Sequence, residues 1–187
     1  AKSSYVQIMN WFVFACGGIF LVTSLFKKEI AELLISKPEF HQHPDALFIV
    51  PILLMANMLL GIFFNLSIWY KLNNKTVLGA AISLLGAAVT IVLLLVYVPV
   101  YGFKAAAVTT LIAYFTMTVL SYFLGQKYYP VNYNVKVVLS LITISVLLYL
   151  VSEYDGLASW SAYFINTIYI SIYGLVGYML MKSTRKS

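Results

Sequence analysis

The chain has 187 residues, of which 62% are hydrophobic and only 10% are charged. Soluble domains are nearer half apolar and a quarter charged, so this composition excludes an ordinary globular protein. The net charge of +6 is small beside the apolar content, which excludes a disordered chain. A single cysteine, Cys16, excludes a disulfide framework and a cysteine-rich metal site. The chain begins Ala-Lys-Ser-Ser, without a start Met or a secretory signal, and we expect it to be a piece of a longer membrane protein.

Six apolar runs are long enough to cross a bilayer, whose core of about 30 Å needs about 20 residues of helix. They are residues 5–26, 48–70, 77–98, 105–125, 135–152 and 160–181. Apart from Lys136 at the edge of the fifth run, none contains Asp, Glu, Lys or Arg. Their apolar residues are continuous and do not alternate, so we predict an all-α bundle of six transmembrane helices and not barrel strands.

The charges predict the orientation of these spans. Eight of the twelve Lys and Arg residues fall on the side of the N-terminus, and the other four share the opposite side with all six acidic residues. Because Lys and Arg accumulate on the cytoplasmic side, both termini are predicted to be cytoplasmic. The aromatic residues Trp69, Tyr70, Tyr128, Tyr129 and Trp160 fall at span ends and are predicted to lie at headgroup level.

The connection between the first two spans has two features of its own. Its first part, residues 28–36, places Ile30, Leu33 and Leu34 on one helical face and Glu29 and Glu32 toward the other, which predicts a short interfacial helix. Farther along, His41 and His43 lie between prolines. Two histidines without a third clustered ligand are ordinarily solvated surface residues, so we predict no metal site and no cofactor.

Small residues on the third span predict close helix packing. Gly79, Ser83 and Ala87 are four residues apart and form one small-residue face. The start of the fourth span is similarly rich in Ala and Thr, and the two helices are candidates to pack against each other.

The second span carries a polar stripe. Asn57, Gly61 and Asn65 recur at four-residue intervals, so two amides and a glycine share one face of the helix. A buried amide in a membrane helix needs a partner from another helix or from a polar cavity, and the sequence is compatible with both. Gly61 is also a candidate packing residue.

No catalytic constellation is present in the sequence: there is no nucleophile with a base, no paired carboxylates in a span and no phosphate-binding glycine loop. Cys16 lies in mid-span, where a thiol is protonated and inert. We therefore predict a protein that is not an enzyme. The basic residues are spread over several short loops, where topology and anionic lipids account for them, so nucleic acid is not an expected partner.

A series of short motifs follows in order between Phe48 and Pro130. They are Val50-Pro51-Ile52-Leu53-Leu54, Asn65-Leu66-Ser67-Ile68-Trp69-Tyr70-Lys71-Leu72, Asn74-Lys75-Thr76, Val98-Pro99-Val100-Tyr101-Gly102, Ala105-Ala106-Ala107-Val108-Thr109 and Gln126-Lys127-Tyr128-Tyr129-Pro130. In order and spacing this stretch resembles the C-terminal part of polysaccharide flippases, the O-antigen and lipid-linked oligosaccharide exporters. They belong to the multidrug/oligosaccharidyl-lipid/polysaccharide exporter superfamily. The chain departs from that family at Ala105, where Gly is frequent, and at Leu94, where Asn is frequent.

The resemblance implies two lobes of six helices, often followed by an extra helix pair. Residues 1–125 would be the last four helices of the second lobe, residues 126–187 would be the extra pair with a basic tail, and an N-terminal lobe would be missing from this piece. The function implied is transfer of a polyprenyl-pyrophosphate-linked glycan from the inner to the outer leaflet of the bacterial cytoplasmic membrane. The partners implied are membrane lipids, this lipid-linked oligosaccharide and the missing lobe.

The same resemblance suggests roles for five residues. Asn57 and Asn65 would line the transport cavity and hydrogen-bond sugar hydroxyls. Lys71 and Lys75 would attract the pyrophosphate at the cytoplasmic mouth, and Lys104 would assist release at the outer end. Contact with lipid headgroups competes as an explanation for each lysine.

Three other functions remain as alternatives. A drug/cation antiporter of the same superfamily would need an acidic residue in a membrane cavity. A small non-transporting accessory or scaffold protein would be complete at this length. A membrane enzyme such as a glycan polymerase would need acid, base or Arg/His groups in an outer loop, and residues 27–47 are too short and proline-broken for that.

Overall fold

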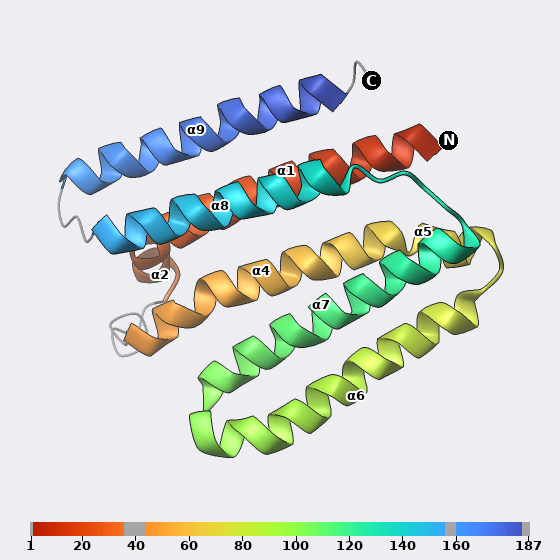
Figure 1. The fold of residues 1–187 in the computed structure, drawn as a ribbon. Helices are drawn as coiled ribbons and strands as arrows, with labels where there is room; N and C mark the ends of the chain where they lie inside the picture. Colours follow the sequence, from red (N-terminus) through yellow and green to blue (C-terminus); the bar gives the residue numbers. More distant parts are fainter. Residues whose placement is uncertain (1, 36–43, 156–159, 185–187) are drawn as a thin grey trace. The chain divides into compact units, whose positions relative to one another are not determined.

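The computed structural model describes residues 2–35, 44–155 and 160–184, and in these ranges it is built of α-helices without strands (Figure 1). The helices are α1 (Lys2–Leu25), α2 (Lys27–Leu34), α4 (Pro44–Leu66), α5 (Ile68–Leu72), α6 (Thr76–Tyr101), α7 (Phe103–Tyr128), α8 (Val135–Asp155) and α9 (Trp160–Thr184). Six helical stretches of the described chain are long and apolar enough to cross a membrane. The predicted all-α fold with six spans is confirmed, and the protein is a multi-pass membrane protein. His41 and His43 fall outside the described residues.

The structure adds a break within one predicted span and moves the end of another. The second span is interrupted at Ser67, whose Oγ donates to the carbonyl of Phe64 at 2.6 Å, so that α4 ends and α5 begins there. Serine hydroxyls that bond back to their own helix disturb its regular hydrogen bonding. The turn expected from residue 98 onward is shorter, because α6 continues through Pro99 to Tyr101. Gly102 makes the reversal with φ of 61°, a backbone region that favours glycine.

The chain divides into two compact units, which are described separately. The first contains Ser3–His41 and Tyr133–Ser187, with α1, α2, α8 and α9, and the second contains Gln42–Asn132, with α4 to α7. The predicted grouping placed residues 1–125 together and 126–187 apart. In the structure α1 is grouped with α8 and α9, and it contacts them through Phe20 on Tyr149 and Phe14 on Tyr173.

In the first unit, two glycines set the contact of α9 with α1. Phe14 of α1 stacks on Tyr173 of α9 with ring centroids 5.6 Å apart, and the Tyr173 hydroxyl donates to the carbonyl of Phe14 at 3.1 Å. Gly17 makes room for the Tyr173 ring, and Gly177 makes room for the Phe14 ring. The N-terminal end of α1 and the C-terminal end of α9 lie at the same end of this unit (Figure 1).

In the second unit, α7 packs against both α4 and α6. Its buried residues include a stripe at four-residue intervals: Ala105, Thr109, Ala113, Met117, Ser121 and Gly125. Because most of these side chains are small, neighbouring helices approach closely. Thr118 adds a polar contact, since its Oγ1 donates to the carbonyl of Leu59 in α4 at 2.9 Å.

The face of α6 that contacts α7 differs from the predicted one. The buried residues of α6 are Gly79, Ile82 and Gly86, whereas Ser83 and Ala87 are exposed. A side chain at Gly86 would collide with Met117 of α7, so this glycine, one position before Ala87, receives the neighbouring helix. Of the three residues predicted to share a packing face, Gly79 is buried beside Tyr70 of α5, and Ser83 and Ala87 are exposed in the part of the chain that the structure describes.

Candidate functional site

The predicted amide stripe lies on an accessible face of α4. Asn57 is exposed, and Gly61 and Asn65 are half-buried. Asn57 Nδ2 donates to the carbonyl of Leu53 at 2.8 Å, and Asn65 Nδ2 donates to the carbonyl of Gly61 at 3.0 Å. Each amide also has a second N–H and an acceptor oxygen. The stripe therefore offers polar groups on the outside of an apolar helix, and Gly61 supplies a carbonyl acceptor to it.

The two predicted mouth lysines flank the α5–α6 turn, with Lys71 in the last turn of α5 and Lys75 immediately before α6. The turn is closed by a bond from the backbone N–H of Lys75 to the carbonyl of Tyr70 at 2.8 Å, and by Asn74 in the left-handed region with φ of 54°. Lys71 is exposed, whereas Lys75 is half-buried with its Nζ 3.5 Å from the centroid of the Tyr128 ring. A cation held over an aromatic face is stabilised and directed by it. Lys71 is thus the more accessible of the two charges.

Trp69 anchors this turn, a role that the sequence did not reveal. Its ring stacks on Tyr128 with centroids 5.7 Å apart, and its Nε1–H donates to Ser121 Oγ at 3.2 Å. Gly125 leaves space for the indole. Trp69 is only 3% exposed and belongs to the core of the second unit, so its ring is covered by protein, and its position at headgroup level stays a prediction. Its place at a span end gave no signal of this, because belt and core tryptophans have the same local sequence.

Lys104 lies apart from the other two lysines. It is in the first turn of α7, whereas Lys75 immediately precedes the other end of the α6–α7 hairpin. Its Nζ is 5.8 Å from the centroid of the Phe48 ring of α4. The structure therefore brings Lys71 and Lys75 together, and it places Lys104 across the length of the helices from them.

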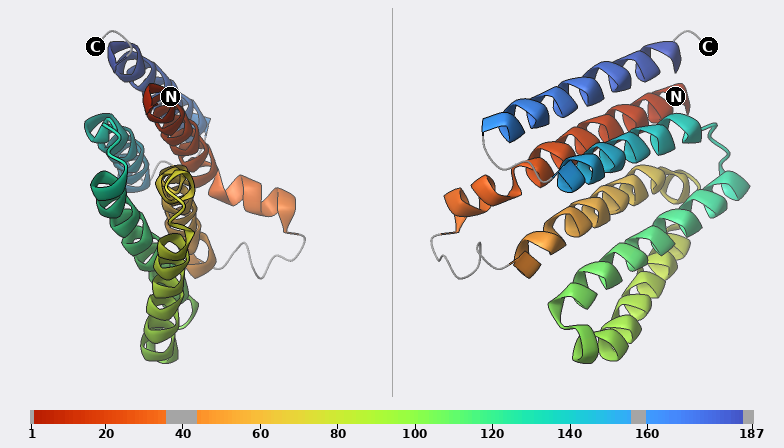
Figure 2. Two further views of the ribbon diagram at one scale, coloured as in Figure 1. Left: turned by 90° about the vertical axis from the view of Figure 1, so that its right-hand side faces the viewer. Right: turned by 60° about the vertical axis from the view of Figure 1, so that its left-hand side comes forward.

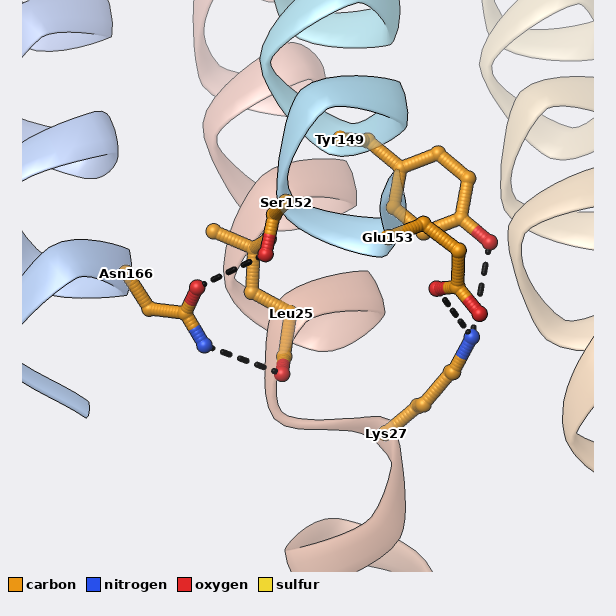
Figure 3. Close-up of polar contacts among 6 residues, drawn as sticks. All are labelled: Leu25, Lys27, Tyr149, Ser152, Glu153 and Asn166. Atoms are coloured by element: carbon orange, nitrogen blue, oxygen red, sulfur yellow. Dashed lines mark hydrogen bonds and ion pairs between the residues drawn. The ribbon is translucent and has the colours of Figure 1, made fainter. Parts of the chain in front are cut away.

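A second polar cluster lies in the first unit, where sequence reasoning proposed no site (Figure 3). Lys27, the first residue of α2, donates from Nζ to Glu153 Oε2 of α8 at 2.8 Å. The Tyr149 hydroxyl is 3.4 Å from the same Nζ, one turn earlier on α8. Beside this pair, Asn166 of α9 accepts from Ser152 Oγ at 2.9 Å and donates to the carbonyl of Leu25 at 3.4 Å.

This cluster joins four helices, α1, α2, α8 and α9, at one end of the first unit. Leu25 is the last residue of α1, and terminal carbonyls of a helix have no partner within it, so Asn166 acts as a cap from another helix. Lys27 and Glu153 were both predicted on the outer side of the membrane. The sequence indicated only that both residues lie on the same side of the membrane and that few acidic residues are available there as partners for Lys27.

The pKa of Lys27 lies above its ordinary value. Burial opposes the charged ammonium, but the hydrogen bond to Glu153 and the neighbouring negative charge outweigh this. A group whose pKa rises on folding stabilises the protein below its unfolded pKa and loses this contribution as the pH rises through the folded value.

We therefore expect the Lys27 contribution to be complete below the ordinary pKa of 10.5 and to be lost as the pH rises from there through the higher pKa of the folded state. The measurement is the Tm difference between wild type and Lys27→Met from about pH 8 to about pH 12, in detergent. The difference should shrink at the alkaline end. A difference that stays constant over the whole range would contradict the assignment.

In the part of the chain that the structure describes, no group of three His, Cys, Asp or Glu residues is placed to hold a metal ion. Comparison of the chain with protein-family models, with curated proteins and with solved structures gives no match.

Proposed function

We propose that the chain is part of a flippase that moves a polyprenyl-pyrophosphate-linked glycan from the inner to the outer leaflet of the bacterial cytoplasmic membrane. Both termini are cytoplasmic in this proposal, as the distribution of Lys and Arg favours. The missing N-terminal lobe supplies the other wall of the transport path.

The observation that carries the proposal is the amide stripe of α4. Asn57 is exposed on a helix whose other exposed side chains, such as Phe64, are apolar. An exposed amide facing hydrocarbon would leave polar groups without partners, which costs free energy. Sugar hydroxyls are both donors and acceptors, so they match the amide groups of Asn57 and Asn65.

The α5–α6 turn supports the proposal with charge. Lys71 is exposed in the last turn of α5 and Lys75 immediately precedes α6, so two lysines lie four residues apart after the amide-bearing helix. A pyrophosphate group is attracted by such a pair, and ammonium groups are common phosphate binders. The pyrophosphate would thus contact the lysines and the sugar would contact the asparagine amides, while the polyprenyl chain stays in the bilayer.

The test is the double substitution Asn57→Leu with Asn65→Leu in the full-length protein. We expect glycan export to fall at least about tenfold with an unchanged membrane level, because loss of two hydrogen-bonding groups costs more than 1.4 kcal/mol. The measurement is surface glycan together with lipid-linked glycan accumulated in the inner leaflet of a deletion strain.

A matched control is available on α9. Thr167 and Ser171 are exposed, four residues apart, and each bonds to a carbonyl of its own helix, as the two asparagines do. Thr167→Val with Ser171→Ala should export normally. Normal export by the asparagine double variant would refute the cavity assignment. A deletion strain that accumulates no lipid-linked glycan, and that becomes sensitive to cationic drugs, would favour the antiporter function.

A further inference from the structure

Helix α2 begins where a membrane span ends. The apolar helix α1 runs to Leu25, and Phe26 alone separates it from α2. Phe26 has φ −107° and ψ 27°, outside the regular helical region, and the chain bends between α1 and α2 (Figure 2). With one residue between them, α2 starts at the boundary of the membrane that α1 crosses.

The base of α2 is fixed to the first unit. The Lys27 side chain is 12% exposed and is paired with Glu153 of α8. The Phe26 ring stacks on Tyr163 of α9, with centroids 6.1 Å apart and planes 13° apart. Two neighbouring residues are therefore held by two different helices, so the direction in which α2 leaves the unit is set by these contacts.

The far end of α2 presents apolar side chains away from the protein. Leu33 is 84% exposed and Leu34 is 74% exposed. Glu32 is also exposed, and it lies about 160° around the helix from Leu34 at 100° per residue. The exposed Glu29 lies about 40° from Leu33, so the leucine pair is bordered by charge. Two leucines of this exposure beside charged residues are typical of a helix lying in a lipid–water interface.

We propose that α2 lies in the interfacial layer of the phospholipid bilayer, with Leu33 and Leu34 in the acyl region, and that the Lys27–Glu153 ion pair holds it there. The sequence alone predicted an interfacial helix; the structure adds the leucine edge that enters the lipid and the anchor that orients it. A lipid monolayer is the occupant because the helix begins at the membrane boundary and its opposite edge is charged. This proposal does not depend on the flippase function.

The test uses single cysteines in the full-length protein carrying Cys16→Ala. Leu34→Cys and Glu32→Cys, on opposite edges, are labelled with the fluorophore NBD and reconstituted into phosphatidylethanolamine/phosphatidylglycerol liposomes. We expect the label at position 34 to emit at shorter wavelength, to be quenched by a phospholipid with a spin label high on its acyl chain, and to resist aqueous iodide. The label at position 32 should show the reverse.

Two other outcomes would overturn the proposal. Equal quenching of both positions by iodide would place α2 in water. Protection of position 34 from both iodide and spin-labelled lipid would show that protein covers the leucine edge.

The anchor is tested in the same liposomes with Glu153→Gln. Loss of the ion pair should lower lipid quenching at position 34 at least about twofold, and exchange of the charges by Lys27→Glu with Glu153→Lys should restore it. Unchanged quenching in Glu153→Gln would refute the positioning role of the ion pair. The lipid contact of α2 is then decided by the comparison between the labels at positions 34 and 32.

Discussion

Gly177→Leu in α9 is expected to destabilise the protein by about 1–3 kcal/mol, the usual cost of inserting a side chain into a packed contact. A Cβ at this position would meet the ring of Phe14, and it would lie 3.2 Å from Leu141 Cδ2 of α8. Phe14 cannot retreat easily, because it is stacked on Tyr173. Three helices meet at this glycine, so we expect a clear loss in Tm when the full-length protein is heated in detergent.

Gly174→Leu is the matched control. It lies one turn earlier on the same helix, and a Cβ there would meet no atom within 4 Å. Both substitutions replace glycine by leucine in a helix, so any gain in helix propensity is shared and the difference between them reports packing. We expect Gly174→Leu to match or exceed wild type in Tm. Equal destabilisation by the two variants would contradict the α1–α9 contact.

Gly79→Leu in α6 is expected to have a comparable effect in the second unit. A Cβ at Gly79 would lie 2.6 Å from Cζ and 2.7 Å from Cε2 of Tyr70. The Tyr70 ring is itself packed edge-on against Trp69, with centroids 5.3 Å apart, so movement of the ring disturbs the buried anchor of the α5–α6 turn. We expect a loss of about 1–3 kcal/mol, measured by thermal unfolding of the full-length protein.

Ser83→Leu distinguishes the observed face of α6 from the one that the sequence predicted. Ser83 is exposed, four residues after Gly79, and its hydroxyl bonds to the Gly79 carbonyl at 3.2 Å. An exposed substitution of this kind ordinarily changes stability by about 0.5 kcal/mol or less. A cost as large as that of Gly79→Leu would show that the predicted face, which also includes Ala87, is a packing surface.

The Gly79 and Gly177 variants also separate stability from transport. Neither residue belongs to the amide stripe or to the lysine turn. If the proposed function is correct, Asn57→Leu with Asn65→Leu should lower export at normal Tm, whereas the glycine variants should lower Tm and membrane level together.

The sequence by itself determined the fold class and the helix positions. Apolar runs of about 20 residues can satisfy their backbone groups in a bilayer only as helices, so length and composition were sufficient to locate all six spans. The four-residue spacing of Asn57, Gly61 and Asn65 likewise determined that they share one helix face, because that relation follows from helix geometry alone.

Only the tertiary structure decided which faces meet. The rotation of α6 that buries Gly86 and exposes Ala87 depends on the shape of Met117 in a different helix, and no local pattern in α6 encodes it. The same holds for Trp69, whose burial depends on Ser121 and Gly125 more than fifty positions away. Small residues on a helix offer several possible contact stripes, and the partner helix selects one of them by fit.

The Lys27–Glu153 pair and the Asn166 cap were beyond sequence reasoning for a related reason. Their partners are separated by 126 and 141 positions, and topology predicts only that they lie on the same side of the membrane. Whether two groups on one side come within hydrogen-bond distance depends on the packing of α8 and α9 against α1. That packing is decided by the contacts of Phe14, Gly17, Tyr173 and Gly177, which are set by side-chain shape and not by hydrophobic pattern.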